Sequence, residues 1–166
     1  VARVRDHALA AESRDQETTT LLALARDLAT ALDVDAIILA VSRHIEEILQ
    51  WRSVFFLPEG EGLAMHTARL GLVLDANEVA VATWAYRHGA VAGYDTETLP
   101  GSRLRYIPLQ SPRGVLGVMG IKPADPAGTI SPEQARILMA FANQTALALE
   151  RVNLAREVAE NSKTDG

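Results

Sequence analysis

The four histidines are the side chains best suited to chemistry in this chain of 166 residues, which contains no cysteine. Neutral imidazoles bind zinc, and a single imidazole can hold haem iron. None of His7, His44, His66 and His88 lies four positions from another ligand type on one expected helix. This spacing does not favour a metal site. One alternative remains, in which His66 or His88 is the single ligand of a haem iron. The favoured interpretation is that these histidines are at the surface or half-buried, so no cofactor is predicted.

The sequence contains none of the common catalytic motifs. It has no G-x-S-x-G elbow, no Walker A loop, no H-E-x-x-H and no C-x-x-C. Gly114, Gly117 and Gly120 are spaced by three, but they lie in an expected strand that runs into a Pro-rich turn. A phosphate-binding loop would lie at a strand-to-helix junction instead. The sequence therefore predicts that this chain catalyses no reaction, and that no metal is bound.

His44 lies in the sequence SRHIEEIL at residues 42–49. This stretch is superficially similar to the phosphoacceptor box of histidine kinases, in which an acidic residue follows the histidine and a proline comes soon after. The proline is missing here. The favoured interpretation is a histidine at the rim of an amphipathic helix, since short motifs often match by chance.

Composition and charge exclude several classes of partner. With 48% hydrophobic residues the chain can bury a core of ordinary size, most simply as one domain. The formal charge of −5 does not suit phosphate binding, so no nucleic acid partner is expected. No apolar run approaches the roughly 20 residues needed to cross a bilayer, so the chain itself is expected to be soluble. The start at Val1 and the polar end suggest a fragment of a longer protein.

Residues 103–122, RLRYIPLQSPRGVLGVMGIK, are expected to form the hairpin at the centre of the fold. Pro112 suits a residue with φ of about −65° and Gly114 suits a left-handed residue, so a type I turn with a bulge fits. In the second strand both alternating sets of side chains are apolar or small, which predicts a central strand covered on both faces. Gly117 and Gly120 predict that another element or a ligand approaches this strand closely.

Helical spacing and end signals predict four helices. Residues 1–32 lack Pro and Gly and form one long helix, of which residues 1–20 are an arm too polar to bury against its own domain. Asp33 is the expected N-cap of a second helix. A third helix begins in a capping-box-like sequence at Asp75 and ends at Gly89, and the last, long helix begins at Ser131 with Gln134 reaching back to the cap.

Strands between these helices complete an α+β fold. Residues 51–57 and 63–68 suit a second hairpin, and a short strand is expected near residues 91–94. The prediction is a central antiparallel sheet of about five or six strands. The long N- and C-terminal helices pair on one face, and a crossover helix with loops covers the other.

Three segments of this sequence form a recognisable pattern: YIPL at residues 106–109, GVLGVMG at 114–120 and FANQTALALER at 141–151. This pattern resembles a GAF domain, a PAS-related fold. Together with AxWAYRHG at 82–89, TLPG at 98–101 and SPEQ at 131–134, the three segments look like the GAF segment of the KdpD family of potassium-responsive, osmosensing sensor histidine kinases. In that family transmembrane helices precede this segment, and the dimerising phosphoacceptor and ATP-binding domains follow it.

The resemblance implies a sensory and signal-relay domain on the cytoplasmic side of the bacterial inner membrane. It implies a pocket between the sheet and the crossover at residues 72–102. The N-K-x-n-F-x-x-x-D-E pattern of cyclic-nucleotide GAF domains and the chromophore cysteine of many phytochromes are both absent. A small-molecule or haem sensor is the alternative function. The candidate pocket residues combine an apolar body with one polar group: Trp84, His88, Tyr94, Arg105 and Tyr106. For Trp84 and Tyr106, packing in the core is the competing interpretation.

The resemblance also implies a homodimer, because related kinases are dimeric. A parallel pairing of the terminal helices would carry a rotation or slide from the arm at residues 1–20, through the domain at 21–155, to the helix end and linker at 156–166. The cognate response regulator of such a kinase would bind the other domains of the parent protein and not this chain. The seam predicted for this dimer contains seven residues: Leu21, Leu24, Leu28, Leu138, Thr145, Leu149 and Val152.

Overall fold

The computed structural model describes the backbone at residues 2–67 and 74–164, and side chains at 14–67 and 74–162. Four helices and five strands lie in this part of the chain, and they agree with the predicted order of elements. The predicted start of the crossover at residues 72–73 lies outside the described residues. The helices are α1 (Ala2–Ala29), α2 (Val34–Leu49), α3 (Ala76–His88) and α4 (Pro132–Thr164). The strands are β1 (Arg52–Glu59), β2 (Gly62–His66), β3 (Ala92–Gly93), β4 (Arg105–Ser111) and β5 (Gly114–Lys122).

All five strands form one antiparallel sheet in the order β2-β1-β5-β4-β3. The predicted hairpin is β4 and β5, which pair from Arg105 with Ile121 to Ser111 with Gly114. Gly114 has φ of 126°, a value that favours glycine in the turn. The predicted central position of β5 is confirmed, since it lies third in the sheet and its residues from Gly117 to Ile121 are buried.

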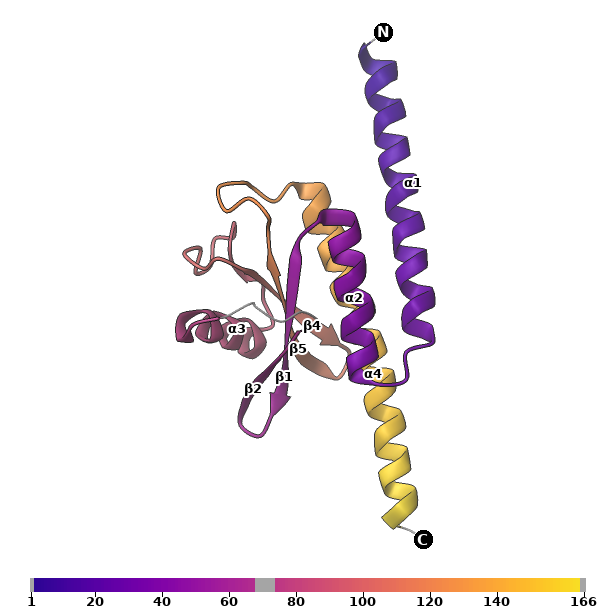
Figure 1. Cartoon of the computed structure of the whole chain (residues 1–166), viewed down its shortest axis with the longest axis vertical. Coiled ribbons are helices and arrows are strands. Elements are labelled where there is room, and N and C mark those ends of the chain that lie inside the picture. The colour runs from indigo at the N-terminus through magenta and orange to yellow at the C-terminus, as the bar shows by residue number, and fades with distance from the viewer. Residues whose placement is uncertain (1, 68–73, 165–166) are drawn as a thin grey trace.

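The two faces of the sheet carry different layers (Figure 1). Helix α3 packs on β3, β4 and β5 on one side, whereas α2 and α4 pack on the other. Helix α1 lies outside α2 and α4 and contacts both, so it forms a third layer. The prediction that the terminal helices pair on one side is confirmed, with α1 resting on α4 and α2.

The two long helices extend past the sheet at opposite ends (Figure 1). α1 and α4 run in the same direction, so the first half of α1 projects above the domain and the last part of α4 projects below it. Both helices are continuous across the predicted boundaries at residues 20 and 155.

Local signals in the sequence account for the helix ends. The Ala36 amide donates to Asp33 Oδ1 at 2.8 Å, which makes Asp33 the N-cap of α2. At the start of α4, Gln134 N–H donates to Ser131 Oγ at 3.1 Å and Ser131 N–H donates to Gln134 Oε1 at 2.9 Å. This is the complete capping box that the sequence predicted.

Two apolar clusters lie on the two faces of the sheet. The larger cluster joins Phe55, Ile107 and Met119 of the sheet to α1, α2 and α4. The smaller cluster joins Phe56, Tyr106 and Val118 to α3. Residues next to one another on β1 and β4 belong to different clusters because successive side chains on a strand point to opposite faces.

Gly117 and Gly120 lie where neighbouring groups approach β5 closely, as the sequence predicted. A Cβ atom on Gly117 would lie 2.6 Å from the Phe56 carbonyl oxygen. A Cβ atom on Gly120 would lie 2.9 Å from a carbon of the Tyr106 ring. The neighbours are therefore protein groups from the adjoining strands.

We expect Gly117→Ala to lower the free energy of unfolding by about 1–3 kcal/mol, because the backbone of β1 would have to move. Gly62→Ala is the matched control, since no atom lies within 4 Å of its Cβ position. Urea denaturation of both variants measures the difference. Equal stability of the two variants would contradict the close approach.

Candidate functional site

The strongest candidate for a functional element is the pairing of α1 with α4. Arg136 donates from Nε and Nη2 to the two carboxylate oxygens of Glu17, each at 3.2 Å. This two-point contact raises the pKa of Arg136, chiefly through the hydrogen bond with Glu17. Because α1 and α4 are parallel, the contact fixes the two helices against sliding at the N-terminal side of their overlap.

Two further contacts hold the middle and the end of the same overlap. Gln144 donates from Nε2 to the carbonyl oxygen of Leu21 at 3.3 Å. Arg151 donates from Nη2 to the carbonyls of Leu28 at 2.7 Å and Ala31 at 2.9 Å. The last carbonyls of a helix lack partners within it, so Arg151 caps the end of α1 from α4.

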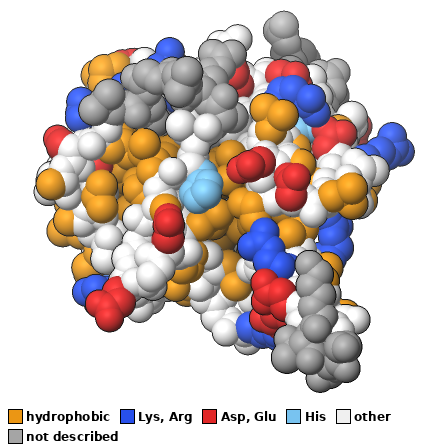
Figure 2. All heavy atoms as spheres, turned by 60° about the horizontal axis from the view of Figure 1, so that its bottom comes forward, with side chains coloured by type: hydrophobic (Ala, Val, Ile, Leu, Met, Phe, Trp, Pro, Cys, Tyr) orange, Lys and Arg blue, Asp and Glu red, His pale blue; other side chains and the backbone are white. Residues whose placement is uncertain are grey.

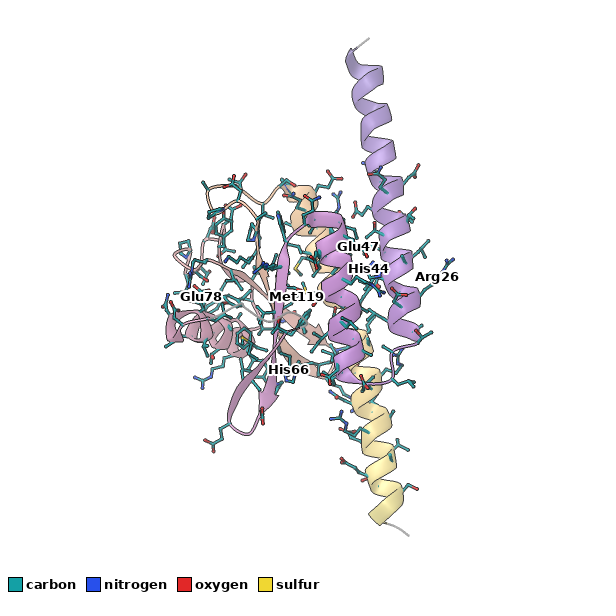
Figure 3. All side chains as sticks on the ribbon, in the orientation of Figure 1. Arg26, His44, Glu47, His66, Glu78 and Met119 are labelled. Carbon is teal, nitrogen blue, oxygen red and sulfur yellow. The ribbon has the colours of Figure 1, made fainter. Side chains whose placement is uncertain are left out.

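Helix α2 is also fastened to α1, through Asp27. His44 Nε2 lies 2.6 Å from Asp27 Oδ2, and Arg43 Nη2 donates to the same oxygen at 2.9 Å. The hydrogen bond with His44 is the main cause that lowers the pKa of Asp27. Figure 3 shows His44 on the side of α2 that faces α1. The sequence predicted that His44 lies at the rim of an amphipathic helix. His44 is in fact buried, although its imidazole points away from the sheet and contacts Asp27 of α1.

The residues predicted for the dimer seam are placed differently from the prediction. Six of the seven are buried within the single chain, and Leu21 is half-buried beside them: Leu24, Leu28, Leu138, Thr145, Leu149 and Val152. This corrects the prediction of which residues could face a second chain. Both helices carry apolar residues on more than one side, and the side that carries the predicted seam packs into the core of the single chain.

The five predicted pocket residues do not meet in one cavity. Tyr106 is completely buried on the α3 side of the sheet. Its ring packs edge-to-face on the Phe56 ring, with the two ring centroids 6.0 Å apart. Arg105 is its neighbour on β4 and therefore points to the opposite face. It borders a shallow pocket of about 540 Å³, together with Val91, Asp95 and Thr98 among others. Burial lowers the pKa of Arg105.

Trp84, His88 and Tyr94 are each engaged with other protein groups. The rings of Trp84 and His88 stack on α3 with centroids 4.2 Å apart, and His88 Nδ1 donates to the Trp84 carbonyl at 2.9 Å. The hydroxyl of Tyr94 donates to the carbonyl oxygen of Gly128. Tyr106 is therefore a core residue, as its competing interpretation proposed, whereas Trp84 is only partly buried.

A buried polar cluster around Glu78 was not predicted as a site. Glu78 on α3 (labelled in Figure 3) is only 2% exposed, and its carboxylate contacts residues 102 and 103, in the segment before β4. Ser102 and Tyr106 donate their hydroxyls to Glu78 Oε1 at 2.5 and 2.9 Å, and the Arg103 amide donates to Oε2 at 3.1 Å. Burial, and then the contact with Glu78, raise the pKa of Tyr106 well above its ordinary value.

This cluster corrects one detail of the sequence interpretation. The capping-box pattern predicted that Glu78 would reach back to its own helix start. Only half of that box forms, in which the Glu78 amide donates to Asp75 Oδ1 at 3.0 Å. The carboxylate instead binds groups that are 24 to 28 positions later in the chain.

An apolar hollow with a histidine at its centre is visible from the lower end of the molecule (Figure 2). On this side, between the start of α2 and β2, a groove of about 410 Å³ is lined by Asp35, Ile38, Leu39, Met65, His66 and Thr67. No group of three or more possible metal ligands is found in the described parts of the chain. No described helix is long and apolar enough to cross a membrane.

Comparison with known proteins connects this architecture to sensor proteins. The family model described as "GAF domain" matches residues 21–151. The chain is 32% identical over 154 residues to Sensor protein KdpD of Escherichia coli, covering 92% of this chain and 17% of that protein. It is 23% identical over 171 residues to Sensor protein KdpD of Clostridium acetobutylicum, covering 98% of this chain and 19% of that protein. The chain thus spans less than a fifth of the length of these relatives.

A solved structure supports the same relationship. The crystal structure of the native GAF domain of the potassium sensor histidine kinase KdpD from Escherichia coli matches with a TM-score of 0.74 and 28% sequence identity. The match covers 86% of this chain and 99% of that one. Since the family model covers most of the chain and the sheet and helices match this domain, the chain belongs to the GAF domain family.

Proposed function

We propose that this chain is the signal-relay GAF domain of a KdpD-like sensor histidine kinase that responds to potassium or osmotic conditions. The similarity to the two KdpD proteins supports the choice of parent. In such a parent the domain lies on the cytoplasmic side of the membrane, between membrane-spanning segments and the kinase core. The domain itself has no turnover, and the response regulator meets only the parent protein.

The observation that carries the relay is the fastening of two parallel helices that leave the domain at opposite ends. The contacts of Arg136, Gln144 and Arg151 tie α4 to α1 along the overlap. A displacement of the arm before residue 17 therefore moves α4 as well, because sliding would break several hydrogen bonds at once. The projecting end of α4 would deliver this displacement to the next domain.

A small-molecule or haem sensor is less well supported by the arrangement of the residues. The five residues predicted for its pocket lie on both faces of the sheet, and Tyr106 has no exposed surface. The Tyr106 ring packs on Phe56 and its hydroxyl is bonded to Glu78, so Tyr106 could line a ligand site only by leaving these contacts.

Inserting residues into the projecting part of α4 tests the relay. The protein for this test is Escherichia coli KdpD with its matching segment replaced by this chain. One alanine after Arg156 turns the following helix by about 100°, whereas seven alanines leave its direction changed by about 20°. We expect one alanine to change the autophosphorylation rate by about 5- to 50-fold, and seven to restore most of it.

The same chimaera without an insertion provides the reference, measured in membranes at low and high potassium. Equal rates for the one-residue and seven-residue insertions would mean that helix direction is not the signal. In that case the relay proposal would fail.

A further inference from the structure

Arg105 on β4 is a cation that the fold leaves without a bonded partner. Its side chain is half-buried, and no hydrogen bond or ion pair joins its guanidinium to another residue in the described part of the chain. Burial lowers the pKa of Arg105, and the negative charge of Asp95 offsets only part of this effect. A guanidinium has five N–H donors, and taking them out of water without acceptors is costly. An anionic group placed against Arg105 would therefore be stabilised.

Arg105 borders a pocket of about 540 Å³ at the β3 edge of the sheet. The other walls of the pocket come from residues on either side of β3, and six residues line it: Val91, Asp95, Thr96, Glu97, Thr98 and Arg105. Pockets of this size hold small molecules in proteins. Of the five pocket residues predicted from the sequence only Arg105 lies here, so this site is distinct from the predicted one.

Hydrogen bonds within the protein fix the wall of this pocket. The Thr98 carbonyl accepts from the Gly93 amide at 2.8 Å, and the Thr96 hydroxyl lies 2.7 and 2.8 Å from the carbonyl oxygens of Gly93 and Thr98. Asp95 Oδ2 accepts from the Ile130 amide at 2.8 Å, which ties the wall to the segment before α4. Groups that are already ordered lose little conformational freedom when a ligand binds.

The charges around the pocket select the class of ligand. Asp95 and Glu97 are exposed on its rim, so two carboxylates lie beside one guanidinium. The carboxylates would repel a dianion such as phosphate, whereas a simple cation would leave the donors of Arg105 without an acceptor. Arg105 and Asp95 interact electrostatically but form no ion pair, so a group can lie between them. A molecule with adjacent anionic and cationic groups matches both signs.

We propose that this pocket binds a small zwitterion of the α-amino acid class. The carboxylate of the ligand accepts hydrogen bonds from the guanidinium of Arg105, and its ammonium group faces Asp95 and Glu97. Val91, which is half-buried against the larger apolar cluster, supplies an apolar surface for a short aliphatic side chain. This binding does not depend on the proposed relay.

Titration of the isotope-labelled chain, followed through its amide resonances by NMR, tests the site with three matched molecules. L-valine carries both charged groups, isovalerate is the same molecule without the amino group, and isobutylamine is the same molecule without the carboxylate. We expect L-valine to bind with a Kd on the order of millimolar, and each of the other two to bind at least roughly fivefold more weakly. The amides of Thr96, Thr98 and Arg105 should shift. Absence of a saturable shift with L-valine, or equally strong binding of either other molecule, overturns the zwitterion site.

Substitutions test the two sides of the pocket separately. Arg105→Met keeps the apolar stem and removes the donors, so it should weaken L-valine binding at least roughly tenfold. Asp95→Asn keeps an oxygen for the Ile130 amide, and asparagine tolerates the φ of 56° at this position. Combined with Glu97→Gln it removes both rim charges, so L-valine and isovalerate should then bind within about twofold of each other.

Arg87→Met is the matched control, because Arg87 is an exposed arginine on α3, which packs on the other face of the sheet. It should leave L-valine binding unchanged within about twofold. Amides far from the pocket report in the same spectra whether each variant is folded. Equal binding of L-valine by Arg105→Met and the natural chain, or an undiminished preference for L-valine over isovalerate in the rim double variant, overturns the proposal.

Discussion

Glu78→Ala is expected to lower the free energy of unfolding by about 3–5 kcal/mol, the largest effect of any substitution considered for this domain. The carboxylate accepts hydrogen bonds from the hydroxyls of Ser102 and Tyr106 and from the amide of Arg103. Removing it leaves buried donors without their acceptor. The Ser102 hydroxyl also lies 3.0 Å from the carbonyl oxygen of Leu104, so it keeps one acceptor. Most of the lost stability therefore comes from the Tyr106 hydroxyl and the Arg103 amide.

Two comparisons make this prediction specific to the cluster. Glu78→Gln keeps an acceptor for the hydroxyls but turns a donor towards the Arg103 amide, so it should recover only part of the loss. Glu47→Ala removes an exposed glutamate from another helix and should change stability by less than about 0.5 kcal/mol. Urea denaturation at neutral pH measures all three. A loss below about 1 kcal/mol for Glu78→Ala would show that the cluster does not hold α3 to the sheet.

The second large effect is expected at alkaline pH and depends on Tyr106. Its pKa is raised in the folded protein because burial, and then the hydrogen bond and the charge of Glu78, disfavour the phenolate. In the unfolded chain a tyrosine has a pKa of about 10. The folded state therefore holds this proton more tightly. Its contribution to stability is complete below about pH 10 and is lost as the pH rises above that value.

The slope of this loss can reach about 1.4 kcal/mol per pH unit. Tyr106→Phe should remove this alkaline limb, at a cost of about 1–2 kcal/mol at neutral pH from the lost hydrogen bond. The test is the free energy of unfolding as a function of pH for both proteins, because their difference cancels other groups that titrate in this range. A difference that does not change above pH 10 would contradict the raised pKa of Tyr106.

These two predictions concern the layer of the domain on the α3 side of the sheet. The cluster of Glu78, Ser102 and Tyr106 lies on the α3 side of the sheet, while the paired helices lie on the other side. The central strand β5 contacts both layers. Substitutions at Glu78 and Tyr106 therefore change the stability of one layer without touching the contacts of Arg136, Gln144 and Arg151 in the other.

Helix and hairpin positions were accessible from the sequence because short-range chemistry decides them. Asp33, Ser131 and Gln134 bond to atoms at most three residues away, so their spacing alone identifies a helix start. The turn at Gly114 likewise depends on the backbone freedom of one residue. The alternation along β5 predicted a strand covered on both sides, and both clusters include its side chains.

The placement of individual side chains depended on contacts between distant parts of the chain. Glu78 has the spacing of a capping residue, but its buried carboxylate accepts hydrogen bonds from three donors at residues 102–106 instead. Arg105 and Tyr106 are adjacent in the sequence but face opposite layers, so both could not line one pocket. Only the register of the sheet decides which of them faces α3.

The seam prediction shows the same limit for the long helices. The sequence by itself determined that α1 is one continuous helix with apolar residues at helical spacing, because spacing and the absence of Pro and Gly are local properties. It contains two such stripes, one with Leu24 and Leu28 and one with Leu22 and Ala25. The tertiary structure decided that the first faces the core, since burial there removes more apolar surface from water against α2 and α4.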